Sequence, residues 1–274
     1  SYFPASYVKW VESGGARVVP IKYDQPLADI EALVRNLNGA LFTGGGADFF
    51  DDDGTLSTFG MAGKTVFDTI VAMNKEGSHV PLWGTCLGFQ FINVLAAGAN
   101  NTLLDSGFDS ENITLPLDFS VDGTSSRMMT AAGPEIVNIL KTQPVTMNNH
   151  QSGVTPAKFM SNPILPDFFT LISTNKDRKG VEFVSTVEGK EFPIYAAQWH
   201  AEKVQFEWDP EEVMNHDYDS THANAFFARF LGGEVRRNNN SFPTADALAD
   251  ALIYNYPVTY TKDIIDFDQC YFFD

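Results

Sequence analysis

The sequence predicts an α/β fold: a three-layer αβα sandwich around a mostly parallel central sheet, of the flavodoxin-like kind. Three observations lead to this prediction. Short apolar runs alternate with helical patterns through the first half of the chain. A β-rich stretch and a long helix follow, and 274 residues are enough to bury a large core. No linker or internal repeat divides the sequence, so we expect a single domain over residues 1–274.

The individual elements follow from the spacing of apolar residues and from the turn residues between them. The expected strands are 16–21, 39–43, 80–84, 181–187 and 192–199, and the expected helices are 26–38, 62–75, 87–98 and 221–237. The runs 181–187 and 192–199 flank a turn and predict a hairpin. Because the first element reads as a helix with no strand before it, we expect the native polypeptide to extend upstream.

Charge and cysteine content exclude several function classes. The chain has 18 Lys and Arg against 35 Asp and Glu, a formal net charge of −17. With no concentration of basic residues, it is not expected to bind nucleic acid or an anionic membrane surface. Two cysteines exclude a disulfide framework. No apolar run approaches the roughly 18 residues of a membrane span.

Cys86 stands out because of its neighbours, Gly84-Thr85-Cys86-Leu87-Gly88. This is a G-x-C-x-G nucleophile elbow between an expected strand and an expected helix, the thiol counterpart of G-x-S-x-G. The sharp turn leaves no room for side chains two residues on either side, and the helix N-terminus favours a thiolate. An isolated cysteine is more often buried and inert, but the strand–elbow–helix context favours a nucleophile.

A thiol nucleophile needs a base, and His200 ends the strong strand FPIYAAQWH. If that strand lies in the same sheet, His200 reaches the edge where Cys86 lies. Glu202 follows at i+2, which in extended chain places both side chains on one side. A carboxylate there orients the imidazole and stabilises its protonated form. His200 and Glu202 are therefore the predicted base and orienting acid, although a lone histidine at a strand end is more often a surface residue.

Acyl transfer also requires N–H donors for the oxyanion. The N–H of Leu87, directly after the nucleophile, is the first candidate. Gly45, within the run Gly44-Gly45-Gly46 at the end of an expected strand, is the second. Three glycines alone more often form a turn, so this assignment depends on Cys86.

These residues also carry a resemblance that runs from residue 1 to residue 274. GTCLGF and the distant QWHAEK resemble the class I glutamine amidotransferase superfamily with its Cys-His-Glu triad. More narrowly, the chain resembles the eukaryotic γ-glutamyl hydrolase family, which cleaves folate polyglutamates. The segments that carry this second resemblance are NGALFTGGGADFF, SSRM, EFVSTVEGKEFPIYAAQWHAEKVQFEW and the tail QCYFFD.

The resemblance implies roles for individual residues. Cys86 matches the nucleophile and His200 the base, while Glu202 matches the acid of the superfamily. Gly45 and Leu87 match the oxyanion donors. His150 matches a histidine in the pocket for the γ-glutamyl group, and Tyr2 falls on a tyrosine near it.

Two positions depart from the family pattern. Gln90 stands where the family commonly has a glutamate, one helical turn behind the thiol, which bears on recognition of the substrate's amino group. Ala201 replaces the usual proline between the histidine and the acid. A protein with a net charge of −17 repels a polyanionic substrate, so the binding site needs hydrogen-bond donors of its own. His150, Arg127 and Lys203 are the candidates.

The resemblance further implies a thioester mechanism with no metal or cofactor, a homodimer, and a lysosomal, vacuolar or secreted glycoprotein. In this family the upstream segment holds the first strand of the sheet. Three N-x-[ST] sequons occur, at Asn100, Asn112 and Asn239, a number close to chance. Two other functions stay open: a glutaminase subunit that supplies ammonia to a synthetase, and a catalytically silent homologue.

Overall fold

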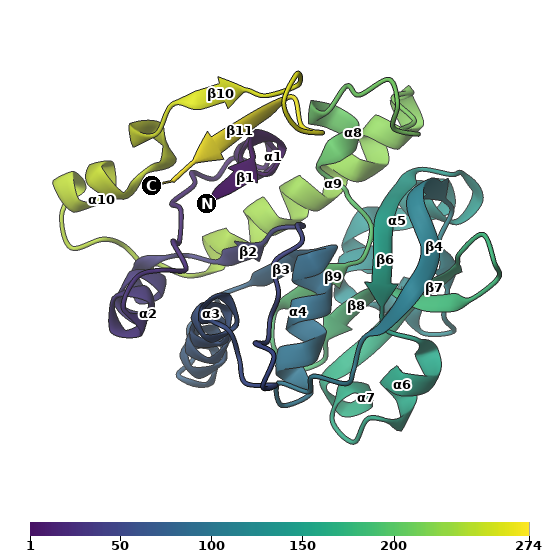
Figure 1. Cartoon of the computed structure of the whole chain (residues 1–274), viewed down its shortest axis with the longest axis horizontal. Coiled ribbons are helices and arrows are strands. Elements are labelled where there is room, and N and C mark those ends of the chain that lie inside the picture. Colours follow the sequence, from purple (N-terminus) through teal and green to yellow (C-terminus); the bar gives the residue numbers. More distant parts are fainter. Residues whose placement is uncertain (274) are drawn as a thin grey trace.

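The computed structural model describes residues 1–273 and has a six-stranded sheet at its centre (Figure 1). Its strands, in spatial order, are β2 (Ala40–Phe42), β3 (Leu82–Thr85), β9 (Ile194–Ala197), β8 (Glu182–Gly189), β7 (Phe169–Lys176) and β5 (Asp118–Phe119). The pairs β2–β3 and β3–β9 are parallel, and the pairs from β9 to β5 are antiparallel. The sheet is therefore mixed and less parallel than predicted, because the hairpin β8–β9 reverses the strand direction.

Helices cover both faces of this sheet, which confirms the α/β layers. One apolar core joins the sheet to α2 (Leu27–Asn36), α3 (Thr58–Lys75), α4 (Leu87–Ala96), α6 (Pro156–Ser161) and α7 (Leu165–Phe168). A second core on the opposite face joins it to α1 (Ala5–Ser13), α5 (Arg127–Thr142) and α9 (Tyr218–Glu234). Among residues 1–273 no helix is long and apolar enough to cross a membrane.

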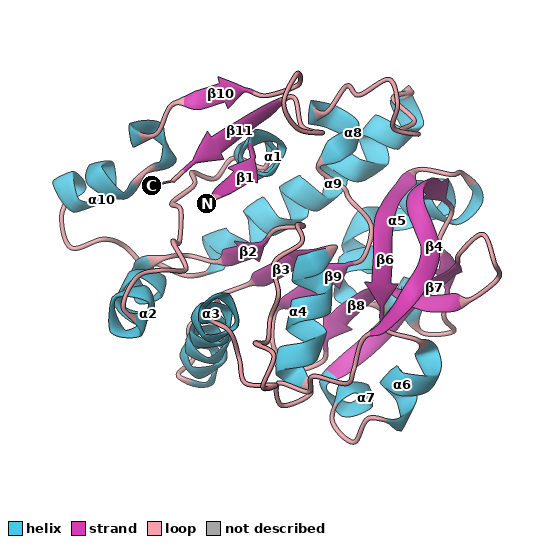
Figure 2. Ribbon diagram, in the orientation of Figure 1, coloured by secondary structure: helices cyan, strands magenta, loops and turns pink. Residues whose placement is uncertain are grey.

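Two smaller sheets flank the central one (Figure 2). An antiparallel ribbon pairs β4 (Asp105–Leu115) with β6 (Thr146–Gly153). At the other side, β1 (Tyr2–Pro4) and β10 (Val258–Tyr260) both pair with β11 (Gln269–Phe272). The remaining short helices are α8 (Lys203–Phe206), α10 (Ala245–Ala251), η1 (Gly123–Ser125), η2 (Val235–Arg237) and η3 (Ile253–Asn255).

The expected strand at 16–21 is wrong, whereas the other predicted strands and helices are present with shifted ends. Residues 16–21 form no strand, although their sequence ARVVPI is apolar and rich in β-branched residues. A strand exists only where its N–H and C=O groups meet a neighbouring strand. Here the Val18 carbonyl accepts from the N–H of Ile253, which lies in η3 rather than in a strand.

We predict that Gly88→Ala destabilises the protein by about 3 kcal/mol, or roughly 6–12 °C in melting temperature. A side-chain carbon at Gly88 would lie 2.1 Å from the Phe42 carbonyl oxygen, so helix α4 would have to move away from β2. Gly233→Ala, in open space on α9, is the matched control and is expected to be neutral or slightly stabilising. Thermal unfolding of both variants tests this, and equal melting temperatures would contradict it.

Candidate active site

Cys86 occupies a strained elbow between β3 and α4. Its backbone has φ 53° and ψ −105°, a region that L-residues rarely adopt. The turn is held because the Cys86 N–H donates to Ala197 O at 2.9 Å. A side-chain carbon at Gly84 would lie 2.6 Å from the Gly88 carbonyl oxygen, so the predicted requirement for glycine at these positions is explained by backbone contact.

His200 and Glu202 lie directly beyond β9 and are almost fully buried. The His200 N–H donates to Met147 O at 2.8 Å, which fixes the end of this segment to β6. His200 Nδ1 lies 2.6 Å from Glu202 Oε1. The pair forms across a turn rather than along an extended strand, so the predicted partnership is present but by a different local geometry.

The charges in this site favour a protonated His200. Burial lowers the pKa of its imidazole. The Glu202 carboxylate and the Cys86 sulfur raise this pKa by more than burial lowers it, and the result is a pKa of about 10. His200 is therefore an imidazolium at neutral pH and can both stabilise a thiolate and donate a proton to a leaving group.

Residues that are far apart in the sequence come together around Gly44. A side-chain carbon at this position would lie 2.6 Å from Tyr7 Oη, 2.9 Å from His200 Cε1 and 3.4 Å from Cys86 Cβ. Three side chains from distant parts of the sequence thus surround one point at the carboxyl edge of the sheet. Cys86 and His200 thus lie beside the same point, as the roles of nucleophile and base would require.

The two candidate oxyanion donors, Gly45 and Leu87, lie close together. Gly45 has φ +153°, and a side-chain carbon there would lie 3.6 Å from Leu87 Cδ2. Leu87 is the first residue of α4, where N–H groups have no partner within the helix. The Gly44 N–H is already used, because it donates to Tyr7 Oη at 2.8 Å. Gly45 and Leu87 are therefore adjacent candidates for the oxyanion hole.

Tyr7 is a site residue that the sequence analysis missed. Its hydroxyl accepts from Gly44 and lies 3.4 Å from His200 Nδ1, in a position fixed by helix α1. The predicted Tyr2 instead lies half exposed on β1, with its ring against Phe272. A signal for Tyr7 was present: it lies on the apolar face of a helix, where a buried tyrosine hydroxyl needs a partner.

His150 and Gln90 form a second polar layer behind the thiol. His150 Nδ1 lies 3.0 Å from Ser152 O, and the Gln90 side-chain amide donates to the same carbonyl at 2.7 Å. His150 Nδ1 therefore carries the hydrogen, while Nε2 is an acceptor without a protein partner among the described residues. Burial, aided by the charge on His200, lowers the pKa of His150 to about 4. This imidazole is neutral at neutral pH, and its contribution to stability is lost as pH falls from 6.5 toward 4.

The two cationic candidates are tied to structural partners. Arg127 pairs with Glu188 at 3.1 Å, where α5 meets the hairpin β8–β9. Lys203 is buried and pairs with Glu212. Neither side chain is free to meet an anionic substrate, so of the three candidate donors only His150 keeps an unused polar atom beside the site. Within residues 1–273, no group of His, Cys, Asp and Glu is arranged to hold a metal ion.

With this geometry in view, comparison with known proteins identifies the family. The model of the peptidase C26 family matches residues 1–202. This chain belongs to the peptidase C26 family. γ-Glutamyl hydrolase B of Dictyostelium discoideum is 38% identical over 274 residues, which cover all of this chain and 77% of that protein. Human γ-glutamyl hydrolase is 36% identical over 273 residues, which cover all of this chain and 83% of that protein.

Among solved structures, SMU.1228c matches this C26 peptidase with a TM-score of 0.51 at 16% identity, over 84% of this chain and 93% of that one. That likeness concerns the fold alone. The resemblance drawn from GTCLGF, QWHAEK and the tail is confirmed by the full-length identity to the γ-glutamyl hydrolases.

We predict that Tyr7→Phe lowers kcat roughly 10-fold to 100-fold, because loss of the hydroxyl releases the Gly44 loop and the His200 ring. It should also destabilise the fold by about 1–3 kcal/mol, since the Gly44 N–H loses its acceptor. The matched control is Tyr254→Phe, which removes a hydroxyl bonded to Glu12 on an exposed ring. Steady-state kinetics of both variants decide the point, and equal turnover would refute the role of Tyr7.

Glu202→Gln is expected to change the pH profile as well as the rate. Glu202 opposes the effect of burial on His200, so without its charge the His200 pKa falls from about 10 toward or below 6.5. The imidazolium is then lost at lower pH, and the basic limb of kcat/KM moves to lower pH while kcat drops about 100-fold.

The control is Glu207→Gln, which neutralises a buried carboxyl bonded to Asp268 N. Burial already raises the pKa of Glu207, so this variant should leave the basic limb in place. A basic limb that stays unchanged in Glu202→Gln would contradict the assignment of the His200 charge.

Proposed function

We propose that this enzyme hydrolyses γ-glutamyl peptide bonds of poly-γ-glutamates, folylpoly-γ-glutamates among them, through a cysteine thioester. The observation that carries the proposal is the convergence of Cys86 and His200 beside Gly44, with Glu202 bonded to the imidazole. Full-length identity to γ-glutamyl hydrolases supports the substrate class.

In the acylation step, the Cys86 thiolate attacks the γ-carbonyl carbon of the scissile amide. The carbonyl oxygen becomes an oxyanion, for which the N–H groups of Leu87 and Gly45 are the donors. His200 then gives its proton to the departing amine nitrogen as the C–N bond breaks. The products are a free amine and a γ-glutamyl thioester on Cys86.

In the deacylation step, His200 is neutral and removes a proton from a water molecule. The resulting hydroxide attacks the thioester carbon, and the C–S bond breaks to release the Cys86 thiolate and a γ-carboxylic acid, which loses its proton to solvent. His200 is again protonated, so the ion pair that began the cycle is restored. Glu202 holds the imidazole in orientation through both steps and keeps its Nδ1 hydrogen bonded.

His150 fits recognition of the γ-glutamyl group. Because its Nδ1 hydrogen is directed to Ser152 O, Nε2 is left as a hydrogen-bond acceptor. An acceptor suits an α-ammonium group, which has only donors. Gln90 supports this arrangement by donating to the same carbonyl, a contact that an ionised glutamate at position 90 has no hydrogen to make.

The cellular setting is part of the same proposal: a glycosylated homodimer in a lysosome, vacuole or the secreted fraction. The three sequons differ in support. Asn239 is exposed, and Asn100 lies in a turn in which its side chain accepts from Thr102. Asn112 instead donates to Glu211 O and accepts from the N–H of Val213. Asn100 and Asn239 are therefore the preferred glycosylation sites.

We predict that Cys86→Ala lowers hydrolysis of a pteroyl-poly-γ-glutamate by about 10⁴-fold or more, since no other group can form the thioester. Cys270→Ala is the matched control: that thiol is buried in β11, so the variant loses a little stability and keeps its turnover. Mass spectrometry of the products, with free glutamine assayed alongside, reports both rate and bond cleaved.

Three outcomes of that assay count against the proposal. Undiminished hydrolysis by Cys86→Ala removes the thioester. Preferential release of ammonia from glutamine by the wild type indicates a glutaminase subunit. A wild-type protein that is inactive on both compounds indicates a silent homologue.

A further inference from the structure

One of the four tryptophans lies at the surface. Trp10, Trp83 and Trp199 are at most 1% exposed and pack in the second apolar core, whereas Trp208 is 63% exposed. An indole has a large apolar area, so leaving it in water forgoes the free energy that burial would give. A single exposed apolar residue is common, but the surroundings of Trp208 set it apart.

The Trp208 ring is held in place without being covered. One face stacks on the imidazole of His216, with ring centroids 4.2 Å apart and planes at 8°. His216 Nδ1 lies 2.8 Å from Val204 O, so this nitrogen carries the hydrogen and ties the imidazole to α8. The Trp208 N–H donates to Asp268 Oδ2 at 3.1 Å, just before β11. The indole is therefore a fixed platform whose other face is open.

Trp208 lies close to the catalytic pair along the chain. It belongs to a strap, residues 207–217, that joins α8 to α9 (Figure 1). It follows Glu202 by six residues, four of which form the single turn of α8. From the rise per residue in helical and extended chain, the Cα atoms of Glu202 and Trp208 are at most about 14 Å apart. An extended pteroyl group with one glutamate can span such a distance.

Hydrogen bonds also connect the strap to the strand beside the thiol. The side chain of Asn112 in β4 donates to Glu211 O at 2.9 Å and accepts from the Val213 N–H at 2.6 Å. The Asn112 N–H donates to Asn149 Oδ1 in β6. The carbonyl oxygen of Asn149 lies 3.8 Å from Cys86 Sγ. The strap is thus fixed to the β4–β6 ribbon where that ribbon borders the active site.

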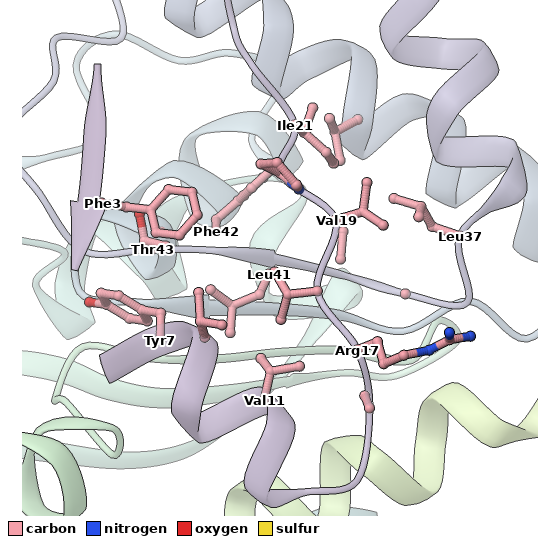
Figure 3. A pocket seen from close by; sticks show the side chains of 18 of the residues that line it. Phe3, Tyr7, Val11, Arg17, Val19, Ile21, Leu37, Leu41, Phe42 and Thr43 are labelled. Atoms are coloured by element: carbon pink, nitrogen blue, oxygen red, sulfur yellow. The ribbon is translucent and has the colours of Figure 1, made fainter. Parts of the chain in front are cut away.

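An apolar cavity of about 1130 Å³ elsewhere in the protein offers no such connection (Figure 3). It runs between the segment 16–23 and β2, and Cys86 and Trp208 are absent from its lining. Tyr7 lies between this cavity and the catalytic pair, since it lines the cavity and its hydroxyl contacts His200. A ring bound in that cavity would be separated from the thiol.

The pteroyl group is the part of a folylpoly-γ-glutamate that the charge of the protein does not repel. Each glutamate of the tail carries a carboxylate, and the protein has a net charge of −17. The pterin is an uncharged, flat nitrogen heterocycle, as a nucleobase is, and such rings stack on exposed aromatic side chains. An open indole face beside the active site therefore suits this end of the substrate.

We propose that Trp208 is the stacking platform for the pteroyl group and holds it where the γ-carbonyl of the first glutamate lies at Cys86. This inference rests on the proposed function, because it names the part of that substrate that the strap binds. The acyl group on the Cys86 thioester is then pteroylglutamyl. The C–N bond that breaks releases the remaining glutamates as the amine, which takes its proton from His200.

Binding is tested apart from catalysis in the Cys86→Ala protein labelled with nitrogen-15. The indole N–H groups of the four tryptophans each give an NMR signal, and Trp208→Phe identifies the Trp208 signal by its loss. Pteroylglutamate should shift that signal saturably. N-acetylglutamate, which lacks the rings, is the control and should leave it unchanged.

Three results of the NMR experiment overturn the proposal. They are an unchanged Trp208 signal, an equal shift with both compounds, and a shift with protein concentration alone. The last would mean that a second copy of the chain covers the indole.

Kinetics test whether the platform serves the reaction. Trp208→Leu should raise KM for pteroyl-di-γ-glutamate about tenfold or more and change that for N-acetyl-di-γ-glutamate less than about twofold. Trp208→Phe keeps a ring and should retain part of the preference. The matched control is Tyr254→Leu, which removes a ring that is 62% exposed outside the strap and should change neither KM. Equal effects of Trp208→Leu on both substrates, or none, contradict the platform.

The position of cleavage gives a separate readout. With pteroyl-tri-γ-glutamate the first products of the wild type should be pteroylglutamate and di-γ-glutamate, identified by mass spectrometry. Pteroyl-di-γ-glutamate as the first product contradicts the placement of the first glutamate at Cys86. A wild type that is inactive on every substrate overturns the proposed function instead, and the NMR experiment still decides whether Trp208 binds the pteroyl group.

Discussion

The active site depends on a buried pair of opposite charges, His200 and Glu202. Both side chains are nearly inaccessible to water, and their contact is 2.6 Å. Desolvation of either charge alone is unfavourable, so removal of one partner from such a pair typically costs about 3–5 kcal/mol. Each group is therefore charged because the other is, and the imidazolium that results is the acid that the leaving amine requires. The Cys86 sulfur also raises the pKa of this imidazole, so the combined effect of Glu202 and Cys86 exceeds that of burial.

Close approach of backbone segments brings these charges together. Near the carboxyl edge of the sheet, three glycines lie too close to their neighbours for a Cβ atom: one in the loop after β2, one in β3 and one in α4. Gly44, Gly84 and Gly88 are the points of contact, and each would place a side-chain carbon under 3.0 Å from another group. The catalytic geometry and the packing of α4 on β2 therefore rest on the same glycines. A substitution among them is therefore expected to change stability and chemistry together, as expected for Tyr7, whose hydroxyl contacts both Gly44 and His200.

Local motifs could be predicted from the sequence, while tertiary partnerships could not. Cys86 was identified because an elbow has a fixed local pattern, and His200 because it ends a strong strand. The turn that joins His200 to Glu202 was not predicted, since i+2 spacing is compatible with both extended and turned backbone. Tyr7 was missed because its partners, Gly44 and His200, are far away in the chain. Residues 16–21 have the composition of a strand but lack a neighbour, which shows that β-propensity describes a suitable surface rather than a backbone preference.

The proposed poly-γ-glutamate substrate is an anion, so an acidic protein needs groups at the site itself to hold it. With a net charge of −17, the electrostatic field of the whole protein repels a poly-γ-glutamate, and Arg127 and Lys203 are paired with Glu188 and Glu212. What remains at the thiol is neutral or local: backbone N–H groups, the acceptor atom of His150, and one imidazolium whose charge is balanced by Glu202. Such groups act over the length of a hydrogen bond, and the strength of their interactions depends little on salt concentration. Under the proposed function, recognition is therefore expected to be concentrated at the γ-glutamyl unit being cleaved.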